Sequence, residues 1–218
     1  MQALRPLFTG LRWTSGIRKN FGSGLKRAFD LIVSLVGLIV LSPLLGLVTV
    51  AVRLTSPGPV LYGSKRVGLG GRTFKMVKFR TMVPGAEKMG PLVTSGDDHR
   101  ITPLGCYLRR TKVDELPTLW NVLKGEMSIV GPRPENPDSA ALYTEEQRRV
   151  WSVKPGITSL ASLKYRHEEK LLAGAADLEA TYFQIMQDKL ALDLEYIKQQ
   201  SFRLDLQIIF RTLRAVLQ

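Results

Sequence analysis

The chain has 218 residues, 44% of them hydrophobic, which is enough for one compact domain with a real core plus a membrane anchor. Its 31 Lys and Arg residues outnumber its 19 Asp and Glu residues, so the formal net charge is +12. That charge favours anionic partners such as nucleic acid, acidic lipid head groups or phosphorylated substrates. The single cysteine, Cys106, excludes an internal disulfide framework, and we expect it to be a small buried residue.

The N-terminal part divides into a basic arm and an apolar segment. Residues 1–24 contain four cations and no acidic residue, which predicts a loosely ordered arm suited to a membrane surface. From Leu31 to Val52 the chain has 22 consecutive uncharged residues, long enough for a transmembrane helix and too long for a signal-peptide core. We therefore assign residues 25–54 to a membrane anchor.

Ser42-Pro43 lies in the middle of this apolar segment and predicts a break in the helix. Proline has no N–H and its ring clashes with the preceding turn, so a helix should break or bend sharply there. The first half would then span about 16 Å, roughly half of the hydrocarbon core. Lys26 and Arg27 before the segment and Arg53 after it draw both ends to the cytoplasm. We predict a re-entrant helix-break-helix anchor, with a Pro-kinked spanning helix as the alternative.

Residues 55–218 predict one compact, mostly helical domain of the α+β class. Two strands, Lys65–Val67 and Thr73–Arg80, read as a β-hairpin whose connecting glycines form a tight turn, because they lack the spacing of a phosphate-binding loop. Caps, a glycine stop and apolar periodicity indicate the helices. These are Thr102–Arg110, a helix starting between Thr111 and Leu116 and ending at Lys124, a short helix after a Thr144–Gln147 capping box, Ala175–Lys198, and an amphipathic helix over Phe202–Leu217.

The segment from Arg109 to Pro117 holds two adjacent carboxylates, Asp114 and Glu115, among cations and beside a helix N-terminus. Opposite charges and the helix dipole should keep at least one of them ionised at pH 7. An ionised carboxylate can attack phosphorus or hold Mg²⁺, while arginines offset the developing charge. The structural alternative is a capping box of Thr111 with Asp114, together with surface ion pairs.

Two further basic motifs are weaker. The Pro-Arg-Pro segment around Arg133 holds one arginine in a stiff extended stretch, which lowers the entropy lost when a guanidinium clamps a phosphate. A structural turn is the alternative interpretation. Lys78 and Arg80 end the predicted hairpin, and alternating basic residues on a strand are typical of a solvated face.

Taken in order, these motifs resemble the bacterial sugar transferase family, the small monotopic phosphoglycosyl transferases, from Lys26 to the C-terminus. The matching stretches are Lys26-Arg27-Ala28-Phe29-Asp30, Ser42-Pro43, Lys78-Phe79-Arg80-Thr81-Met82, Asp114-Glu115-Leu116-Pro117-Thr118-Leu119-Trp120-Asn121-Val122-Leu123-Lys124-Gly125, Gly131-Pro132-Arg133-Pro134 and Lys154-Pro155-Gly156-Ile157-Thr158. Each is weak alone, whereas their joint order is specific. After Thr158 the sequence departs from the family pattern over residues 159–167, which indicates a different sugar or an altered pocket rim.

The resemblance implies transfer of a sugar-1-phosphate from a UDP-sugar to undecaprenyl phosphate, giving undecaprenyl-diphosphate-sugar and UMP. Asp114 matches the family's nucleophile, which forms a covalent phosphosugar-aspartate, and Glu115 matches its partner. Mg²⁺ bound by Asp114 would neutralise the leaving phosphate. The positions that match substrate- or phosphate-binding residues are Arg80, Arg109, Arg133, Arg166 and Asp193. For Asp193, solvation on a helix is an equal interpretation.

The resemblance also implies a location and partners. It places the anchor break at Ser42-Pro43 and the enzyme on the cytoplasmic face of a bacterial inner membrane, among membrane lipids, at the first membrane step of a surface polysaccharide or glycoconjugate pathway. We expect no nucleic-acid partner, because no helix-turn-helix, RRM or zinc-finger pattern is present. A catalytically silent scaffold is a third reading, against which the intact Asp114, Glu115 and Arg133 argue. The sequence decides neither the sugar nor the oligomeric state, and a dimer is compatible with it.

Overall fold

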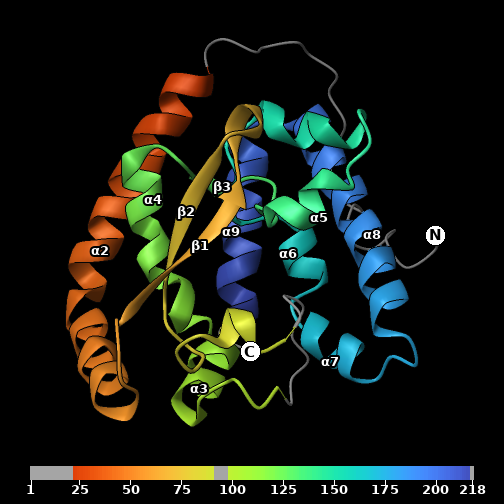
Figure 1. Cartoon of the computed structure of the whole chain (residues 1–218). Coiled ribbons are helices and arrows are strands. Elements are labelled where there is room, and N and C mark those ends of the chain that lie inside the picture. Colours follow the sequence, from red (N-terminus) through yellow and green to blue (C-terminus); the bar gives the residue numbers. More distant parts are fainter. Residues whose placement is uncertain (1–21, 91–97, 217–218) are drawn as a thin grey trace.

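The computed structural model describes residues 22–90 and 98–216 (Figure 1). The predicted basic arm, residues 1–24, therefore lies almost wholly outside the described residues. One long helix, α2 (Gly22–Thr55), runs along one side of the molecule, and a second, α8 (Leu178–Gln199), lies on the opposite side. A β-hairpin and shorter helices fill the space between them. The predicted class, a mostly helical α+β fold, is confirmed.

The predicted hairpin is present. Strand β1 (Leu61–Val67) pairs antiparallel with β2 (Thr73–Phe79), from Leu61 opposite Phe79 to Val67 opposite Thr73. The connecting turn uses Gly70 at φ 66° and Gly71 at φ 74°, a conformation that glycine adopts without a steric penalty. The glycine cluster is therefore a tight turn, as expected.

A second, two-stranded sheet fixes the Pro-Arg-Pro segment. Strand β3 (Ser128–Val130) pairs in parallel with β4 (Gly156–Thr158), and β3 leads directly into Gly131. Gly156 packs directly on Gly131, because a Cβ added to Gly156 would lie 2.1 Å from the Gly131 nitrogen. The two glycines let these backbones touch, and this close contact determines where the chain leaves β3.

The helices follow the predicted start and stop signals closely. Thr102 accepts a hydrogen bond from the Gly105 N–H at 2.9 Å, as an N-cap does, and Gly125 ends a helix at φ 86°. The Thr144–Gln147 capping box also forms, although it opens a 3₁₀ segment. The remaining helices are α3 (Pro103–Thr111), α4 (Leu119–Lys124), α5 (Pro137–Ala141), α6 (Leu160–Lys164), α7 (Glu168–Ala173) and α9 (Phe202–Val216), and 3₁₀ segments cover Leu69–Gly71, Ala86–Lys88, Val113–Thr118 and Gln147–Ser152.

The prediction that Cys106 is buried is wrong. Cys106 is exposed on α3, because this helix turns Gly105 and Leu108 toward the protein interior. The main core instead gathers apolar side chains from β2, α4, β3, α8 and α9. Its most deeply buried members are Met76, Val122, Met127, Val130, Tyr196 and Ile208.

The predicted break in the anchor is also wrong at the level of the backbone. Helix α2 continues through Pro43 as a single 34-residue element, and its ribbon curves in Figure 1 without losing its coil. The missing N–H of Pro43 would leave the carbonyl of Ile39, four residues earlier, without a partner. The Ser42 hydroxyl donates to that carbonyl at 2.8 Å, which compensates for the proline and lets the helix continue.

Candidate active site

The two adjacent carboxylates lie on a sharp turn of the backbone. Helix α3 ends at Lys112, the one non-glycine residue with positive φ (59°) among the described residues. The chain then enters the 3₁₀ segment Val113–Thr118, with Asp114 and Glu115 in its first turn. Backbone strain of this kind is often found at functional sites. The segment packs against β2, which brings Asp114 and Glu115 under the hairpin.

The structural alternative for this segment is not what the structure shows. The Thr111 hydroxyl donates to the carbonyls of Tyr107 (2.9 Å) and Leu108 (3.2 Å) and does not cap Asp114. Asp114 is only 7% exposed, and the Glu115 carboxylate is also mostly covered. The dyad is therefore buried, and surface ion pairs do not describe it.

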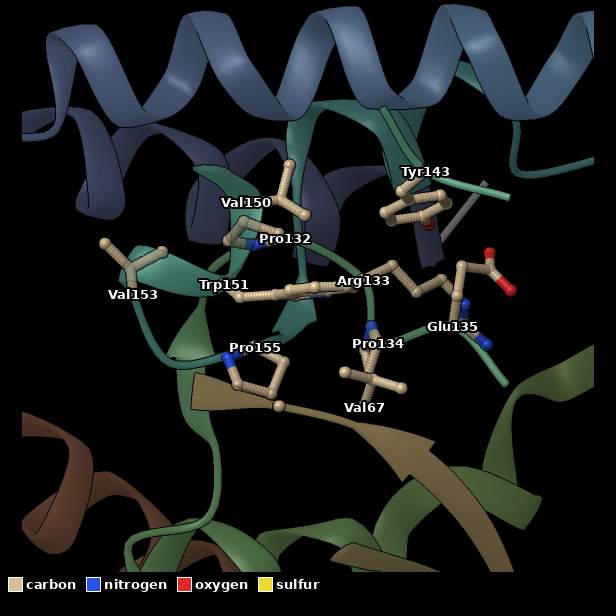
Figure 2. Close-up of a pocket in the computed structure, with 11 residues that line it drawn as sticks. Val67, Pro132, Arg133, Pro134, Glu135, Tyr143, Val150, Trp151, Val153 and Pro155 are labelled. Atoms are coloured by element: carbon tan, nitrogen blue, oxygen red, sulfur yellow. The ribbon is translucent and has the colours of Figure 1, made fainter. Parts of the chain in front are cut away.

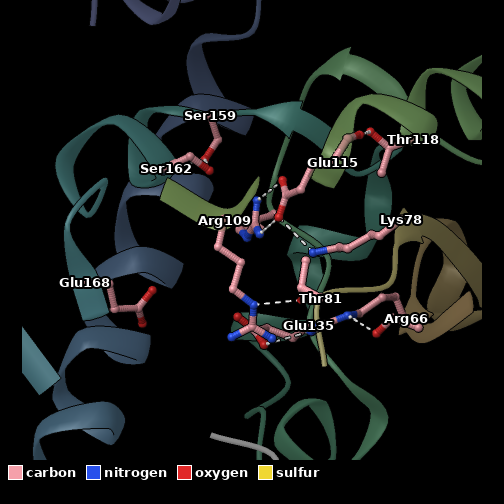
Figure 3. Close-up of polar contacts among 12 residues, drawn as sticks. Arg66, Lys78, Thr81, Arg109, Glu115, Thr118, Glu135, Ser159, Ser162 and Glu168 are labelled. Carbon is pink, nitrogen blue, oxygen red and sulfur yellow. Dashed lines mark hydrogen bonds and ion pairs between the residues drawn. The ribbon is translucent and has the colours of Figure 1, made fainter. Parts of the chain in front are cut away.

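Two cations fix the Glu115 side chain (Figure 3). Lys78 from β2 donates to Oε1 at 2.7 Å, and Arg133 donates to Oε1 at 2.6 Å and to Oε2 at 3.2 Å. Burial alone would raise the pKa of Glu115, but Arg133 and Lys78 together outweigh it and hold this pKa well below its usual range. Glu115 is thus a permanent anion with both oxygens engaged.

The surroundings of the Asp114 carboxylate are the opposite of those of Glu115. Its Oδ1 is buried and has no hydrogen-bond partner among the described residues. Burial, followed by repulsion from Glu115, raises the pKa of Asp114 to about 6, although Lys78 and Lys112 oppose the shift. At pH 7 most Asp114 side chains are therefore ionised and carry an oxygen with no partner. Such an oxygen is available to a ligand or a reaction centre.

Helix α8 positions the backbone of Arg133. The backbone N–H of Arg133 donates to Oδ2 of Asp193 at 3.3 Å. Asp193 is fully buried, its pKa is raised to about 7 by that burial, and its Oδ1 has no partner among the described residues. The solvated-helix interpretation of Asp193 is therefore wrong. The Arg133 segment is also more than a turn, because its guanidinium reaches Glu115.

A small cavity lies beside Arg133 (Figure 2). Its walls include the Pro-Arg-Pro segment, Val67 and the rings of Tyr143 and Trp151, which stack with centroids 5.8 Å apart. A volume of about 10 Å³ holds one water molecule at most. The stacked rings thus support the arginine loop and do not form a nucleotide pocket in this conformation.

The other predicted arginines lie at different distances from the dyad. Arg109 donates to the Thr81 hydroxyl at 2.9 Å and is one of the cations that act on the pKa of Asp114. Arg80 is buried and donates to the Ser56 carbonyl at 2.8 Å. Arg166, in the turn after α6, makes no hydrogen bond or ion pair with the described part of the chain. The structure therefore brings Asp114, Glu115, Arg133 and, through its backbone contact, Asp193 together, but not Arg166.

Sequence reasoning missed Lys78, which it placed on a solvated face. A signal was present, since Lys78 lies among apolar neighbours on both faces of a strand, including Met76 and Phe79, which are both buried. A cation at the end of a strand with two apolar faces is a candidate for a buried ion pair. Its partner, Glu115, is 37 residues away in the sequence.

The dyad also offers a place for a divalent cation. No group of three or more His, Cys, Asp and Glu side chains suited to a metal ion occurs in residues 22–90 and 98–216. Mg²⁺, however, is usually held by one or two carboxylates together with substrate phosphates and water. The Asp114 carboxylate, whose buried Oδ1 has no partner among the described residues, fits one such ligand position through its other oxygen.

Comparison with known proteins agrees with this site. The family described as "Bacterial sugar transferase" matches residues 21–218. The UDP-N-acetylgalactosamine-undecaprenyl-phosphate N-acetylgalactosaminephosphotransferase of Aeromonas hydrophila is 35% identical over 88% of this chain and 44% of its own length. The undecaprenyl-phosphate glucose phosphotransferase of Komagataeibacter xylinus is 42% identical over 87% of this chain and 35% of its own length.

The chain thus spans less than half of these two relatives, but it also matches a protein of similar size. The exopolysaccharide production protein ExoY of Sinorhizobium fredii is 34% identical over 93% of this chain and 89% of its own length. The match to the family covers the anchor, the dyad and the Pro-Arg-Pro segment together. The chain therefore belongs to the bacterial sugar transferase family, as its motifs predicted.

Proposed function

We propose that this protein transfers a sugar-1-phosphate from a UDP-sugar to undecaprenyl phosphate, releasing UMP, as an early membrane step in making a surface polysaccharide or glycoconjugate. The names of its relatives support the reaction class. The observation that carries the proposal is the contrast within the dyad. Glu115 has both oxygens bound by cations, whereas Asp114 keeps a buried oxygen with no partner among the described residues.

In the first step, Oδ1 of Asp114 attacks the β-phosphorus of the UDP-sugar. The new bond joins this oxygen to phosphorus, the bond from phosphorus to the bridging oxygen breaks, and UMP leaves with that oxygen. Arg133 and Lys78 lie beside the dyad and offset the negative charge that develops on the phosphate oxygens. Asp114 supplies one ligand for Mg²⁺, which when bound neutralises charge on the diphosphate.

In the second step, a phosphate oxygen of undecaprenyl phosphate attacks the same phosphorus atom. The bond to Asp114 breaks, its carboxylate is regenerated, and the product is undecaprenyl-diphosphate-sugar. Glu115 holds Arg133 and Lys78 in place through both steps, because its two oxygens are shared between them. A single buried site thus serves both substrates in turn.

The packing of α2 supports a monotopic arrangement at the cytoplasmic face of the inner membrane. Near its start, Asp30 of α2 accepts a hydrogen bond from the Ile129 N–H at 3.0 Å. Near its end, Val52 is buried against Phe79 and Leu108. Both halves of the helix therefore contact the same folded domain. We infer that a helix held in this way keeps both of its ends on the side of the bilayer on which that domain lies.

The outward face of α2 is suited to lipid. Helix Gly24–Thr55 is long and apolar enough to cross a membrane by length and composition. Apart from Arg53 in the last turn, its large exposed side chains are apolar, and they are Leu25, Leu31, Ile32, Leu35, Val36, Ile39, Val40, Leu44, Leu47, Val50 and Leu54. A continuous exposed apolar surface of this kind marks a membrane contact. We propose that α2 lies along the membrane with this face in one leaflet, so that both of its ends stay on the cytoplasmic side.

Radiolabelled substrate tests the reaction directly. Detergent-solubilised protein with Mg²⁺ and a UDP-sugar labelled in the sugar and β-phosphate should acquire covalent label when no acceptor is present, and should lose it when undecaprenyl phosphate is added. Asp114→Asn should take up no label, whereas Asp138→Asn, which changes an exposed carboxylate on α5, should label normally. A panel that includes UDP-glucose and UDP-N-acetylgalactosamine identifies the sugar. Turnover by Asp114→Asn at a tenth of the wild-type rate would remove Asp114 from the nucleophile role.

A further inference from the structure

Arg80 is a buried cation without an anionic partner among the described residues. Its side chain is 8% exposed, and Nη2 donates to the Ser56 carbonyl at 2.8 Å. Its Nε and Nη1 have no hydrogen-bond partner in residues 22–90 and 98–216, and no carboxylate of those residues forms an ion pair with it. A buried charge is costly unless it is paired, so a protein that keeps one without a partner usually has a ligand for it.

The hairpin relates Arg80 to Lys78, the strand cation that binds Glu115. Arg80 N–H donates to the Val60 carbonyl at 2.9 Å, which extends the β1–β2 ladder by one residue past the pair Leu61–Phe79. Side chains two residues apart on a strand point to the same face, about 7 Å apart. Arg80 therefore follows Lys78 on the face of the hairpin that meets Glu115.

The other side of Arg80 faces the membrane anchor. Ser56, which binds its Nη2, is the first residue after α2. Gly58 covers Nη1, since a Cβ added to this glycine would lie 2.6 Å from that nitrogen. From the last turn of α2, Arg53 donates to the Gly58 carbonyl at 3.2 Å. Arg80 thus lies under the linker Ser56–Gly58, at the point where the chain leaves α2.

We propose that Arg80 binds the phosphate of the lipid acceptor, undecaprenyl phosphate, and delivers it to the second step. This inference rests on the proposed function. When the linker Ser56–Gly58 moves aside, Nη2 leaves the Ser56 carbonyl and joins Nε in a two-pronged edge that matches two phosphate oxygens. The donor diphosphate is served by Arg133 and Lys78, which lie at the dyad itself.

The position of Arg80 favours the acceptor over the donor. The polyprenyl chain stays in the lipid, so its phosphate must enter from the side on which α2 meets the domain. Arg80 is the buried cation that contacts this entry through Ser56, whereas Arg133 approaches Glu115 from the β3–β4 sheet and α8. The two substrates therefore use different cations around one nucleophile.

The experiment separates the two half-reactions. Exchange of labelled UMP into UDP-sugar without acceptor requires only the first step, and full turnover requires both. For Arg80→Gln we expect exchange within about twofold of wild type, turnover reduced at least tenfold at low acceptor concentration, and a raised KM for undecaprenyl phosphate with an unchanged KM for UDP-sugar. Arg80→Lys keeps the charge and loses the two-pronged edge. Its turnover and its KM for undecaprenyl phosphate should therefore lie between those of wild type and Arg80→Gln. Lys75→Gln, which removes an exposed cation from the same strand, should match wild type.

Each of the other outcomes contradicts either the proposed function or the proposed role of Arg80. If wild type shows neither exchange nor turnover, the proposed function fails whatever Arg80 does. If wild type is active and either Arg80 variant, folded by its melting temperature, loses exchange as much as turnover, Arg80 serves the donor or the fold and the inference is wrong. Unchanged KM for the acceptor in both variants also overturns it. If phosphatidylglycerol in the same detergent competes with undecaprenyl phosphate mole for mole, the site is a general lipid-phosphate site and not an acceptor site.

Discussion

At the scale of single residues, the structure assigns different tasks to two neighbouring carboxylates. Asp114 and Glu115 lie in the same turn of the backbone and both are mostly buried, but different side chains surround their two carboxylates. Glu115 meets Lys78 and Arg133, whereas the Asp114 carboxylate has no close cation pair. The pKa of Glu115 is held well below its usual range and that of Asp114 is raised to about 6. One group is thus a fixed anion that organises cations, and the other keeps the unpartnered oxygen that the proposed nucleophile needs.

The burial of Asp114 should cost stability, and removing its charge should recover that cost. Because its folded pKa of about 6 lies above the unfolded value of 3.8, the ionised form destabilises the fold at pH above 6, and the effect disappears below pH 4. Asp114→Asn should therefore be inactive and yet more stable at pH 8, by about 2–3 kcal/mol at most. Melting of both proteins in detergent at pH 8 and pH 4 checks this. An equal or lower melting temperature for the variant at pH 8 would contradict the description of Asp114.

The same pKa predicts the acid limb of the activity. Below about pH 6 Asp114 takes up a proton and loses its nucleophilic lone pair, while Glu115 stays ionised. The rate of covalent labelling in the absence of acceptor should therefore fall about tenfold per pH unit below 6, as for one titrating group. Glu115→Gln should be severely impaired, and its residual rate should hold to lower pH because the repulsion that raises the pKa of Asp114 is gone. A limb that does not move in this variant would show that another group controls the titration.

At the scale of elements, sequence patterns predicted the features that depend on interactions between residues close together in the chain. The hairpin, the Thr102 cap of α3 and the helix from Phe202 depend on neighbours in the sequence, and all three are present. The errors of the sequence analysis concern side chains whose partners lie far away in the sequence. Lys78 and Asp193 find theirs 37 and 60 residues away, so the strand pattern placed Lys78 in solvent and the helix pattern left solvation of Asp193 as an equal alternative.

Pro43 shows a different limit of sequence analysis. The rule that proline breaks a helix was applied to Pro43 without its neighbour Ser42, whose hydroxyl makes this helix an exception. A proline usually breaks a helix because one carbonyl loses its donor, and here the Ser42 hydroxyl supplies the donor to Ile39. Reading Ser42-Pro43 as a pair would have predicted a continuous helix. The side of the membrane that each end occupies cannot be read from either pattern.

Accessibility labelling tests the placement of α2. Cysteines introduced at Ser23 and Ser64 in a Cys106→Ser background lie before and after the anchor. Because both halves of α2 pack on one domain, both cysteines should resist a membrane-impermeant thiol reagent added to intact cells and should react after the cells are opened. Cys106, exposed on α3 in the wild-type protein, reports the side of the membrane on which the domain lies. Labelling of position 23 from outside would establish a spanning helix.

At the scale of the whole molecule, the anchor is part of the core. Lys26 forms an ion pair with Asp205 of α9 at 2.6 Å, and Arg27 donates to the carbonyls of Val122 and Leu123 at the end of α4. The first turns of α2 therefore close the C-terminus of the helix that follows the dyad and neutralise a buried carboxylate. The membrane helix and the catalytic domain fold as one unit.

Breaking this ion pair should destabilise the whole protein. In Lys26→Met the Asp205 carboxylate, which is almost fully buried, keeps only the Tyr196 hydroxyl among its described partners, and a buried charge left in this way costs about 3 kcal/mol. The melting temperature in detergent should fall accordingly, and adding Asp205→Asn should recover part of the loss. Lys65→Met, which removes an exposed lysine from β1, is the control. An unchanged melting temperature in Lys26→Met would show that the anchor is only attached to the domain.

The separation of these partners along the chain sets an order of events during synthesis. Lys26 precedes Asp205 by 179 residues, and Asp30 precedes its partner Ile129 by 99. A ribosome adding roughly 5–20 residues per second needs roughly 10–35 s to make the longer stretch. The apolar helix is made long before these partners: Arg27 and Asp30 have none until the segment from Val122 to Ile129 is made, and Lys26 lacks Asp205 for the whole interval. We expect the hydration of these charges to hold that end of the helix on the side of the ribosome before the domain folds. Their later burial against α9, α4 and β3 would then fix this orientation.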